Sequence, residues 1–160
     1  MTRLFGAMII FLVCSAVGFS ASKMCSRRVK QLEAFASLIS YISAQIEGFL
    51  TPLDRIYATA KSPVLDECSF LKVLRQNGGV EAMHMCRPSL SLTDSECAQL
   101  ERFFEGLGHH SADEETRHCA YFEKLVRGFA ETARTELPSK GRVCRTIGML
   151  FGIMLALVLL

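Results

Sequence analysis

The residues of this chain whose types could do chemistry gather in one short stretch, LGHHSADEETRHC. It holds the metal-ligand types His109, His110, Glu114, His118 and Cys119. Glu114 and His118 are four residues apart, so a helix would place them on one face. The zinc-binding spacings H-x-x-x-H and H-E-x-x-H are absent from the sequence. We favour the alternative, a polar loop followed by an acidic helix start that complements the helix dipole, and expect no metal.

Motifs of catalysis are missing from the sequence as well. SKGRVC lacks the spacing, and the Ser or Thr after lysine, that a phosphate-binding loop needs. There is no G-x-S-x-G elbow, and no spacing pairs a cysteine with a histidine as nucleophile and base. We therefore expect a protein that is not an enzyme, carries no cofactor and takes no small-molecule substrate.

Charge is confined to the middle of the chain. Arg3 is the one charged residue outside 23–145, and the formal net charge of the 160 residues is only +2. That balance gives no reason to expect nucleic acid as a partner. The uncharged ends, 4–22 and 146–160, would form helices of about 28 and 22 Å, against a hydrocarbon core of about 30 Å. We predict a transmembrane helix at each end and a soluble domain over 23–145.

Positive charge flanks both predicted spans on the side of the central domain. The basic residues are Lys23, Arg27, Arg28 and Lys30 after the first span, and Lys140, Arg142 and Arg145 before the second. Because basic loops stay in the cytoplasm, we expect a multi-pass protein of the cell membrane with a cytoplasmic centre and both termini outside. The basic side chains are expected to contact membrane lipids at their anionic headgroups.

A different topology remains open from the N-terminal segment and the cysteines. Residues 4–22 follow a short basic start and could be a signal peptide, although no A-x-A triplet marks a cleavage site. Cleavage after Ser22 would leave six of the seven cysteines, an even number that permits disulfides in an exported protein with a C-terminal membrane anchor. The cysteines stand mostly among helix-patterned apolar positions and form no C-x-x-C pair, so we favour reduced thiols and a retained anchor.

Apolar residues in the centre recur in steps of three and four, which predicts helices. Two seams predict long helices that pair antiparallel, over 23–50 and 113–136. The first seam is Leu32, Phe35, Ile39, Ile42, Ile46 and Phe49, and the second is Cys119, Phe122, Val126, Phe129 and Ala133. No strand-like alternation appears. The predicted fold class is all-α, a helical bundle in which the two long helices continue into the N- and C-terminal transmembrane helices.

Shorter helices are predicted between the two seams. Thr51 is expected to cap the first, with Pro52 at its first position. A helix over about 64–76 is expected to end at Asn-Gly-Gly, and Val80 to Arg87 would add one or two turns. Thr93 and Glu96 form a capping box for the helix that follows.

Small residues recur at helical spacing in both predicted spans. Gly148 and Gly152 form a G-x-x-x-G row in the last span, and Cys14, Gly18 and Ser22 form a row in the first. Such rows let helix backbones approach closely in lipid. Two explanations of these rows remain open: close helix packing in lipid, or the general frequency of glycine in membrane helices.

Together these segments resemble one family. The basic KMCSRRVKQL, the long helix ending in QIEGFLTPL, the FFEGLG helix and the terminal GMLFGIMLALVLL are similar in order and spacing to stage III sporulation protein AB. That family resembles the cytoplasmic helical domain of type II secretion F proteins. Carried over by position, the structural turn residues are Gly48, Thr51, Pro52, Leu53, Leu107 and Gly108.

The resemblance implies a non-catalytic membrane platform in the channel complex between mother cell and forespore. Its implied partners are other sporulation channel proteins, a cytoplasmic ATPase and further copies of the chain. A contact surface is expected on the loop and helix start that carry His109, His110, Asp113, Glu114 and Glu115. The chain departs from the family where HHSA follows Leu107-Gly108, and at Pro138, which should break or kink the last helix.

Overall fold

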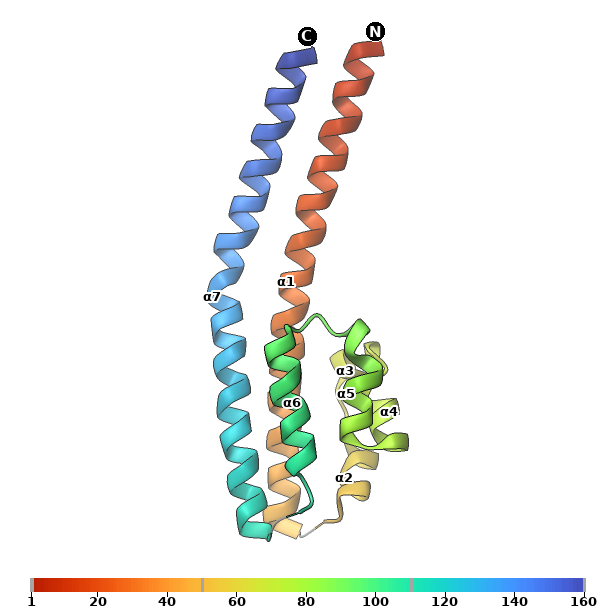
Figure 1. Ribbon diagram of the computed structural model, residues 1–160, viewed down its shortest axis with the longest axis vertical. Coiled ribbons are helices and arrows are strands. Elements are labelled where there is room, and N and C mark those ends of the chain that lie inside the picture. The colour runs from red at the N-terminus through yellow and green to blue at the C-terminus, as the bar shows by residue number, and fades with distance from the viewer. Residues whose placement is uncertain (1, 50, 110, 160) are drawn as a thin grey trace. The chain divides into compact units, whose positions relative to one another are not determined.

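A computed structural model describes the backbone of residues 2–49, 51–109 and 111–159, and the side chains of residues 24, 26–49, 51–109 and 111–136. Every element in this part is helical (Figure 1). In chain order they are α1 (Thr2–Phe49), α2 (Leu53–Thr59), α3 (Pro63–Glu67), α4 (Phe70–Asn77), α5 (Gly79–Cys86), the 3₁₀ turn η1 (Arg87–Ser89), α6 (Asp94–Gly106) and α7 (Ala112–Leu159). The predicted all-α fold class is confirmed.

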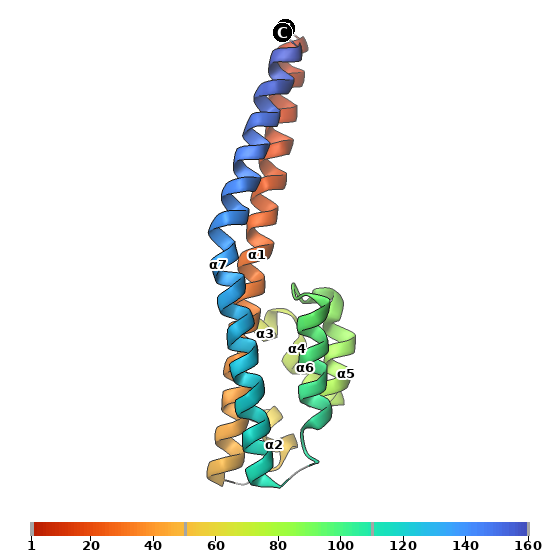
Figure 2. The same cartoon turned by 60° about the vertical axis from the view of Figure 1, so that its left-hand side comes forward.

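The chain divides into two compact units. One holds residues 1–27 and 132–160, and the other holds residues 28–131. In the second unit, residues 28–49 of α1 and 112–131 of α7 run side by side and antiparallel, as Figures 1 and 2 both show. The helices α2 to α6 complete this unit.

The ends of the chain were predicted to span a membrane. Over the residues that the structure describes, none of the helices has the length and the apolar character that crossing a bilayer requires. The side chains of 4–22 and 146–160, the two predicted spans, lie outside those residues. The spans therefore stay predictions.

The core of the second unit is a chain of aromatic rings that joins four helices. Phe35 of α1 meets Phe70 of α4 edge-on at a centroid distance of 4.9 Å, and Phe70 lies 6.0 Å from Phe104 of α6. Phe103 of α6 lies 5.6 Å from Phe122 of α7. Such tilted and edge-on pairs add to the apolar burial that holds the helices together. Both predicted seams thus face one core.

The seam residues lie where the periodicity predicted, except that Phe129 is only half-buried and Phe49 is exposed. Leu32, Phe35, Ile39, Ile42 and Ile46 are buried, as are Cys119, Phe122, Val126 and Ala133. Phe49 is 75% exposed, so its assignment to the seam was wrong. It is the last residue of α1, where the helix ends before another turn could cover it.

The predicted helix over 64–76 is two helices, α3 and α4. Ser69 separates them with φ of 59°, in the left-handed region that only glycine adopts without cost. Gly78 follows α4 with φ of 86°, which confirms the predicted stop at Asn-Gly-Gly. Gly79, the first residue of α5, lies against the ring of Phe104. A Cβ at this position would lie 2.2 Å from the ring atom Cδ1, so the close approach requires glycine.

Two other helix boundaries differ from the predictions. Helix α2 begins at Leu53 with Pro52 in the cap position, and no side chain caps it, so the prediction of Thr51 as the cap was wrong. Pro52 has no N–H group to donate. Its carbonyl oxygen accepts hydrogen bonds from the backbone N–H groups of Arg55 and Ile56 in α2. Helix α7 continues through Pro138 to Leu159, so the helix is not broken there as one of the two predicted outcomes required. One proline removes only one backbone hydrogen bond, and the rest of the helix continues.

Candidate interaction site

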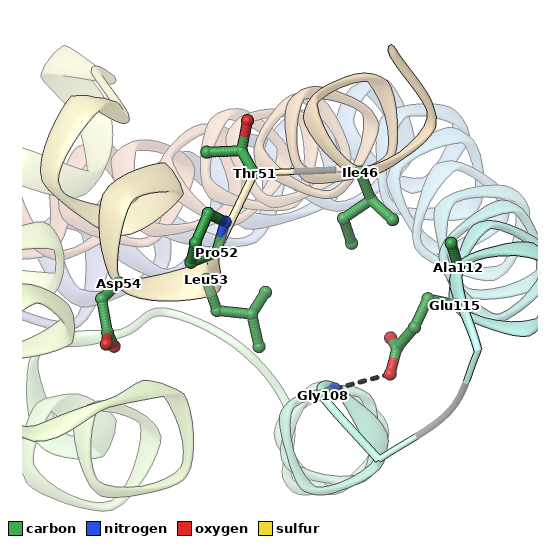
Figure 3. A pocket seen from close by; sticks show the side chains of 8 residues that line it. All are labelled: Ile46, Thr51, Pro52, Leu53, Asp54, Gly108, Ala112 and Glu115. Atoms are coloured by element: carbon green, nitrogen blue, oxygen red, sulfur yellow. Dashed lines mark hydrogen bonds between the residues drawn. The ribbon is translucent and has the colours of Figure 1, made fainter. Parts of the chain in front are cut away.

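The two turns that carry the predicted turn residues meet at a pocket. One turn joins α1 to α2 and the other joins α6 to α7. Between them lies a cavity of about 380 Å³ (Figure 3). Its walls come from Ile46, Thr51, Pro52, Leu53, Asp54, Gly108, Ala112 and Glu115. Figure 3 shows Leu53 reaching into the cavity from α2 and Glu115 facing it from α7.

Gly108 is the residue that lets the two turns approach each other. Its φ is +91°, and a Cβ there would lie 2.9 Å from Cδ1 of Leu53. Its N–H donates a hydrogen bond of 2.6 Å to Oε1 of Glu115 (Figure 3). A side chain at position 108 would therefore be strained both by the backbone and by its neighbour.

Glu115 is a buried acid, with only 5% of its surface exposed. It lies in the first turn of α7, close to the positive end of the helix dipole. The side chain was expected on an exposed contact surface. The structure turns it inward instead, to brace the turn at Gly108.

Two titratable side chains near Glu115, Tyr57 and Cys119, have raised pKa values. Burial raises the pKa of Tyr57 to about 12, and the negative charges of Asp54 and Glu115 add to the effect. Burial also raises the pKa of Cys119 to about 12, with a further contribution from Glu115. Both groups are therefore protonated at neutral pH, and Cys119 has the character of a packed core residue.

The two remaining predicted turn residues, Leu107 and Gly48, differ in burial. Leu107 is buried in the core. Gly48 is exposed in the last turn of α1, and a Cβ there would meet nothing within 4 Å. The geometry therefore requires glycine at position 108 and not at position 48.

The other predicted contact residues lie at the surface. His109, Asp113 and Glu114 are exposed, whereas His110 falls outside the described residues. The backbone N–H of Ser111 donates a hydrogen bond of 3.4 Å to Oε2 of Glu114. The loop and the start of α7 thus present two exposed carboxylates beside the pocket.

The residues weighed as metal ligands do not come together in the described part of the chain, where no group of three such residues could hold an ion. His118 lies flat against Phe103 at a centroid distance of 5.5 Å, and its Nε2 donates to the Phe103 carbonyl at 3.0 Å. A Cβ at Gly106 would lie 2.6 Å from the His118 ring, so this glycine gives the ring its space. His118 therefore joins α7 to α6.

A buried polar network on α1 was missed by the sequence reasoning. Arg28 donates from Nη2 to Oε1 of Glu96 at 2.7 Å, and Oε2 of Glu96 accepts the N–H of Thr93 at 2.8 Å. Glu96 is 2% exposed. The predicted capping box is confirmed, and its acid also binds α1. Nothing in the local pattern indicated this pairing, because the two residues are 68 positions apart.

Arg28 was predicted to contact lipid headgroups, and its guanidinium is engaged with Glu96 with 24% of the side chain exposed. Arg27 and Lys30 are exposed. The side chains of the other predicted headgroup residues lie outside the described part: Lys23, Lys140, Arg142 and Arg145. The side chains of the helix-packing residues Cys14, Gly18, Ser22, Gly148 and Gly152 also lie outside it.

Fold and site together define an all-α protein on two long helices, with an acidic pocket between its inter-helix turns. The chain belongs to the stage III sporulation protein AB family, whose model matches residues 3–160. Comparison with curated proteins and with solved structures finds no match. The suspected family is confirmed, and its description assigns the chain a role in sporulation.

Proposed function

We propose that this protein is a membrane platform of the channel complex between mother cell and forespore, with no catalysis of its own. The observation that carries the proposal is the family match over residues 3–160 of a chain whose two ends are almost free of charge. Segments 4–22 and 146–160 act as the membrane spans, and the central helices lie in the cytoplasm. The basic residues next to the spans support this orientation.

Polar side chains that join separate elements support a scaffold role. Gln31 and Glu96 hold loops and helix ends to one another, and Glu115 braces a turn. Arg75 donates from Nη2 to the Ala60 carbonyl at 2.7 Å, and so closes the end of α2. Each of these groups is used in holding the helices in place, which is what a rigid platform requires.

The partner surface that we propose is the acidic one beside the pocket. Asp54, Asp113 and Glu114 are exposed on or near its walls. A channel protein or the cytoplasmic ATPase would meet this face through basic side chains, since opposite charges steer association and fix orientation. Further copies of the chain would assemble through the membrane spans.

Co-purification tests this function. The tagged chain, extracted in mild detergent from sporulating cells, is expected to retain the neighbouring channel proteins. The double variant Asp113→Lys, Glu114→Lys should lose most of that binding. The matched control is Asp66→Lys, Glu67→Lys, which reverses an adjacent pair of exposed acids on α3 and should keep it. Equal retention by both variants would refute this surface, and no channel protein bound to the unchanged chain would refute the platform role.

A further inference from the structure

One serine contacts the backbone of two cysteines that do not line the pocket. Cys68 follows α3, and Cys86 is the last residue of α5. The hydroxyl of Ser89 lies 2.7 Å from the carbonyl oxygen of Cys86 and 3.3 Å from that of Cys68. The backbones that carry the two thiols therefore meet on either side of a single hydroxyl group.

Gln31 of α1 fixes the sulfur of Cys68. The backbone N–H of Ser91 can only donate, and it lies 2.7 Å from the Gln31 Oε1. This contact assigns the other end of the amide, so that Nε2 donates to the Cys68 Sγ at 3.0 Å. The amide N–H thus holds this sulfur in one position beside α1.

The two thiols differ in their access to solvent. Cys68 is half-buried, whereas Cys86 is only 5% exposed. Burial raises the pKa of Cys86, and the neighbouring Cys68 adds to the effect. A small oxidant from solvent therefore meets Cys68 first, and Cys86 is held beside it as a protonated thiol.

We propose that Cys68 and Cys86 form a reversible oxidation site, in which peroxide oxidises Cys68 and Cys86 then closes a disulfide with it. In the first step the Cys68 sulfur attacks one oxygen of hydrogen peroxide. An S–O bond forms as the O–O bond breaks, the leaving hydroxide takes up the Cys68 thiol proton and departs as water, and a sulfenic acid remains. In the second step the Cys86 sulfur attacks the Cys68 sulfur, and the S–O bond breaks. The hydroxide leaves with the Cys86 proton as water, so two thiols lose two electrons and peroxide gains two.

The disulfide would change the contacts of α1. A Cys68 sulfur bonded to Cys86 takes up a new position, and the Gln31 amide that holds it also holds Ser91, just before α6. Oxidation at the junction of α3 and α4 would thereby reach the loop that leads into α6. A reductant of the thiol class, such as glutathione, would restore the first state.

Peptide mapping of the full-length chain in detergent tests the site directly. Trypsin releases Cys68 within 62–72, but it leaves Cys86 and Cys97 together in 76–102, because Pro88 blocks cleavage after Arg87. The measurement is therefore made on the chain and on Cys97→Ser, whose buried thiol is the matched control. After treatment with equimolar hydrogen peroxide, a dithiothreitol-sensitive link between the two peptides is expected in both proteins.

Two further variants separate the steps. Cys86→Ser should give no link and should leave a sulfenic acid at Cys68 that dimedone captures. Gln31→Leu should slow oxidation of Cys68 by about threefold to tenfold, since it removes one hydrogen bond to the sulfur. Circular dichroism before oxidation confirms that each variant is folded. The proposal is overturned if Cys68 stays reduced, if it links to any other cysteine or to a second chain, or if its sulfenic acid accumulates while Cys86 is present.

Discussion

At Gly108 both the backbone conformation and a neighbouring side chain favour glycine over any larger residue. The left-handed φ and the approach to Leu53 together predict that Gly108→Ala lowers the free energy of unfolding by about 1–3 kcal/mol. Gly48→Ala is the control, since that glycine lies in open space within α1, and a gain of about 0.5–1 kcal/mol is expected. Thermal unfolding of the detergent-solubilised chain, followed by circular dichroism, measures both. A loss no larger at position 108 than at position 48 would contradict the role given to this turn.

Glu96 predicts how stability depends on pH. Burial alone would raise its pKa, but hydrogen bonds from Arg28 and Thr93 outweigh burial and hold the pKa below its usual value of 4.5. A lowered pKa means that ionised Glu96 stabilises the fold above about pH 4.5, and that this stability is lost as the pH falls through the folded-state pKa. Unfolding measured from about pH 6 to about pH 3 should therefore show a steep decline.

The same titration has two matched variants. Glu96→Gln removes the charge and should flatten the acid limb, which is the decline in stability below about pH 4.5. It should also lower stability near neutral pH, because Arg28 loses its ionic partner. Arg28→Met should also flatten it, since the acid then lacks the guanidinium that lowers its pKa. An acid limb identical in all three proteins would mean that other carboxylates govern acid unfolding.

At the scale of elements, α6 depends on its first turn. Thr93 accepts the backbone N–H of Glu96 through its side chain, and Glu96 returns the bond to the Thr93 N–H. Thr93→Ala is expected to cost about 0.5–2 kcal/mol. Glu105→Ala, an exposed change in the last turn of the same helix, should cost almost nothing. Comparison of the two melting temperatures checks the prediction, which fails if the two variants melt together.

The elements also show what the sequence could and could not predict. The apolar periodicity placed Leu32 to Ile46 and Cys119 to Val126 in the core, because burial follows the helical repeat directly. It could not place Ser69, since serine is common in helices and the left-handed turn is imposed by the packing of α3 and α4. Local patterns also miss pairs such as Arg28 and Glu96, which depend on the tertiary fold.

The candidate site followed the same division. Thr51, Pro52, Leu53 and Gly108 were predicted as structural turn residues, and they meet at one pocket. That they would form a single cavity could not be predicted, because two turns far apart in the sequence create it. The inward position of Glu115 likewise depends on the N–H of Gly108, which no helix periodicity encodes.

At the scale of the whole molecule, we propose that the ends of the chain lie in a bilayer and the helices α2 to α6 in the cytoplasm. One feature of the described centre is compatible with that proposal. The four described cysteines are free thiols, namely Cys68, Cys86, Cys97 and Cys119. Reduced thiols are normal in a cytoplasmic domain, where disulfides persist poorly. The oxidation site proposed above would then respond to a change in that compartment.

The proposed membrane topology is tested most directly by the accessibility of an introduced cysteine in sporulating cells. Lys72 is exposed on α4, so Lys72→Cys places a reactive thiol on the surface of the central unit. We predict that the protein stays in the membrane pellet after carbonate washing, and that a membrane-impermeant maleimide labels position 72 only after the cells are permeabilised. Labelling of position 72 in intact protoplasts, or release of the chain into the soluble fraction, would contradict the account.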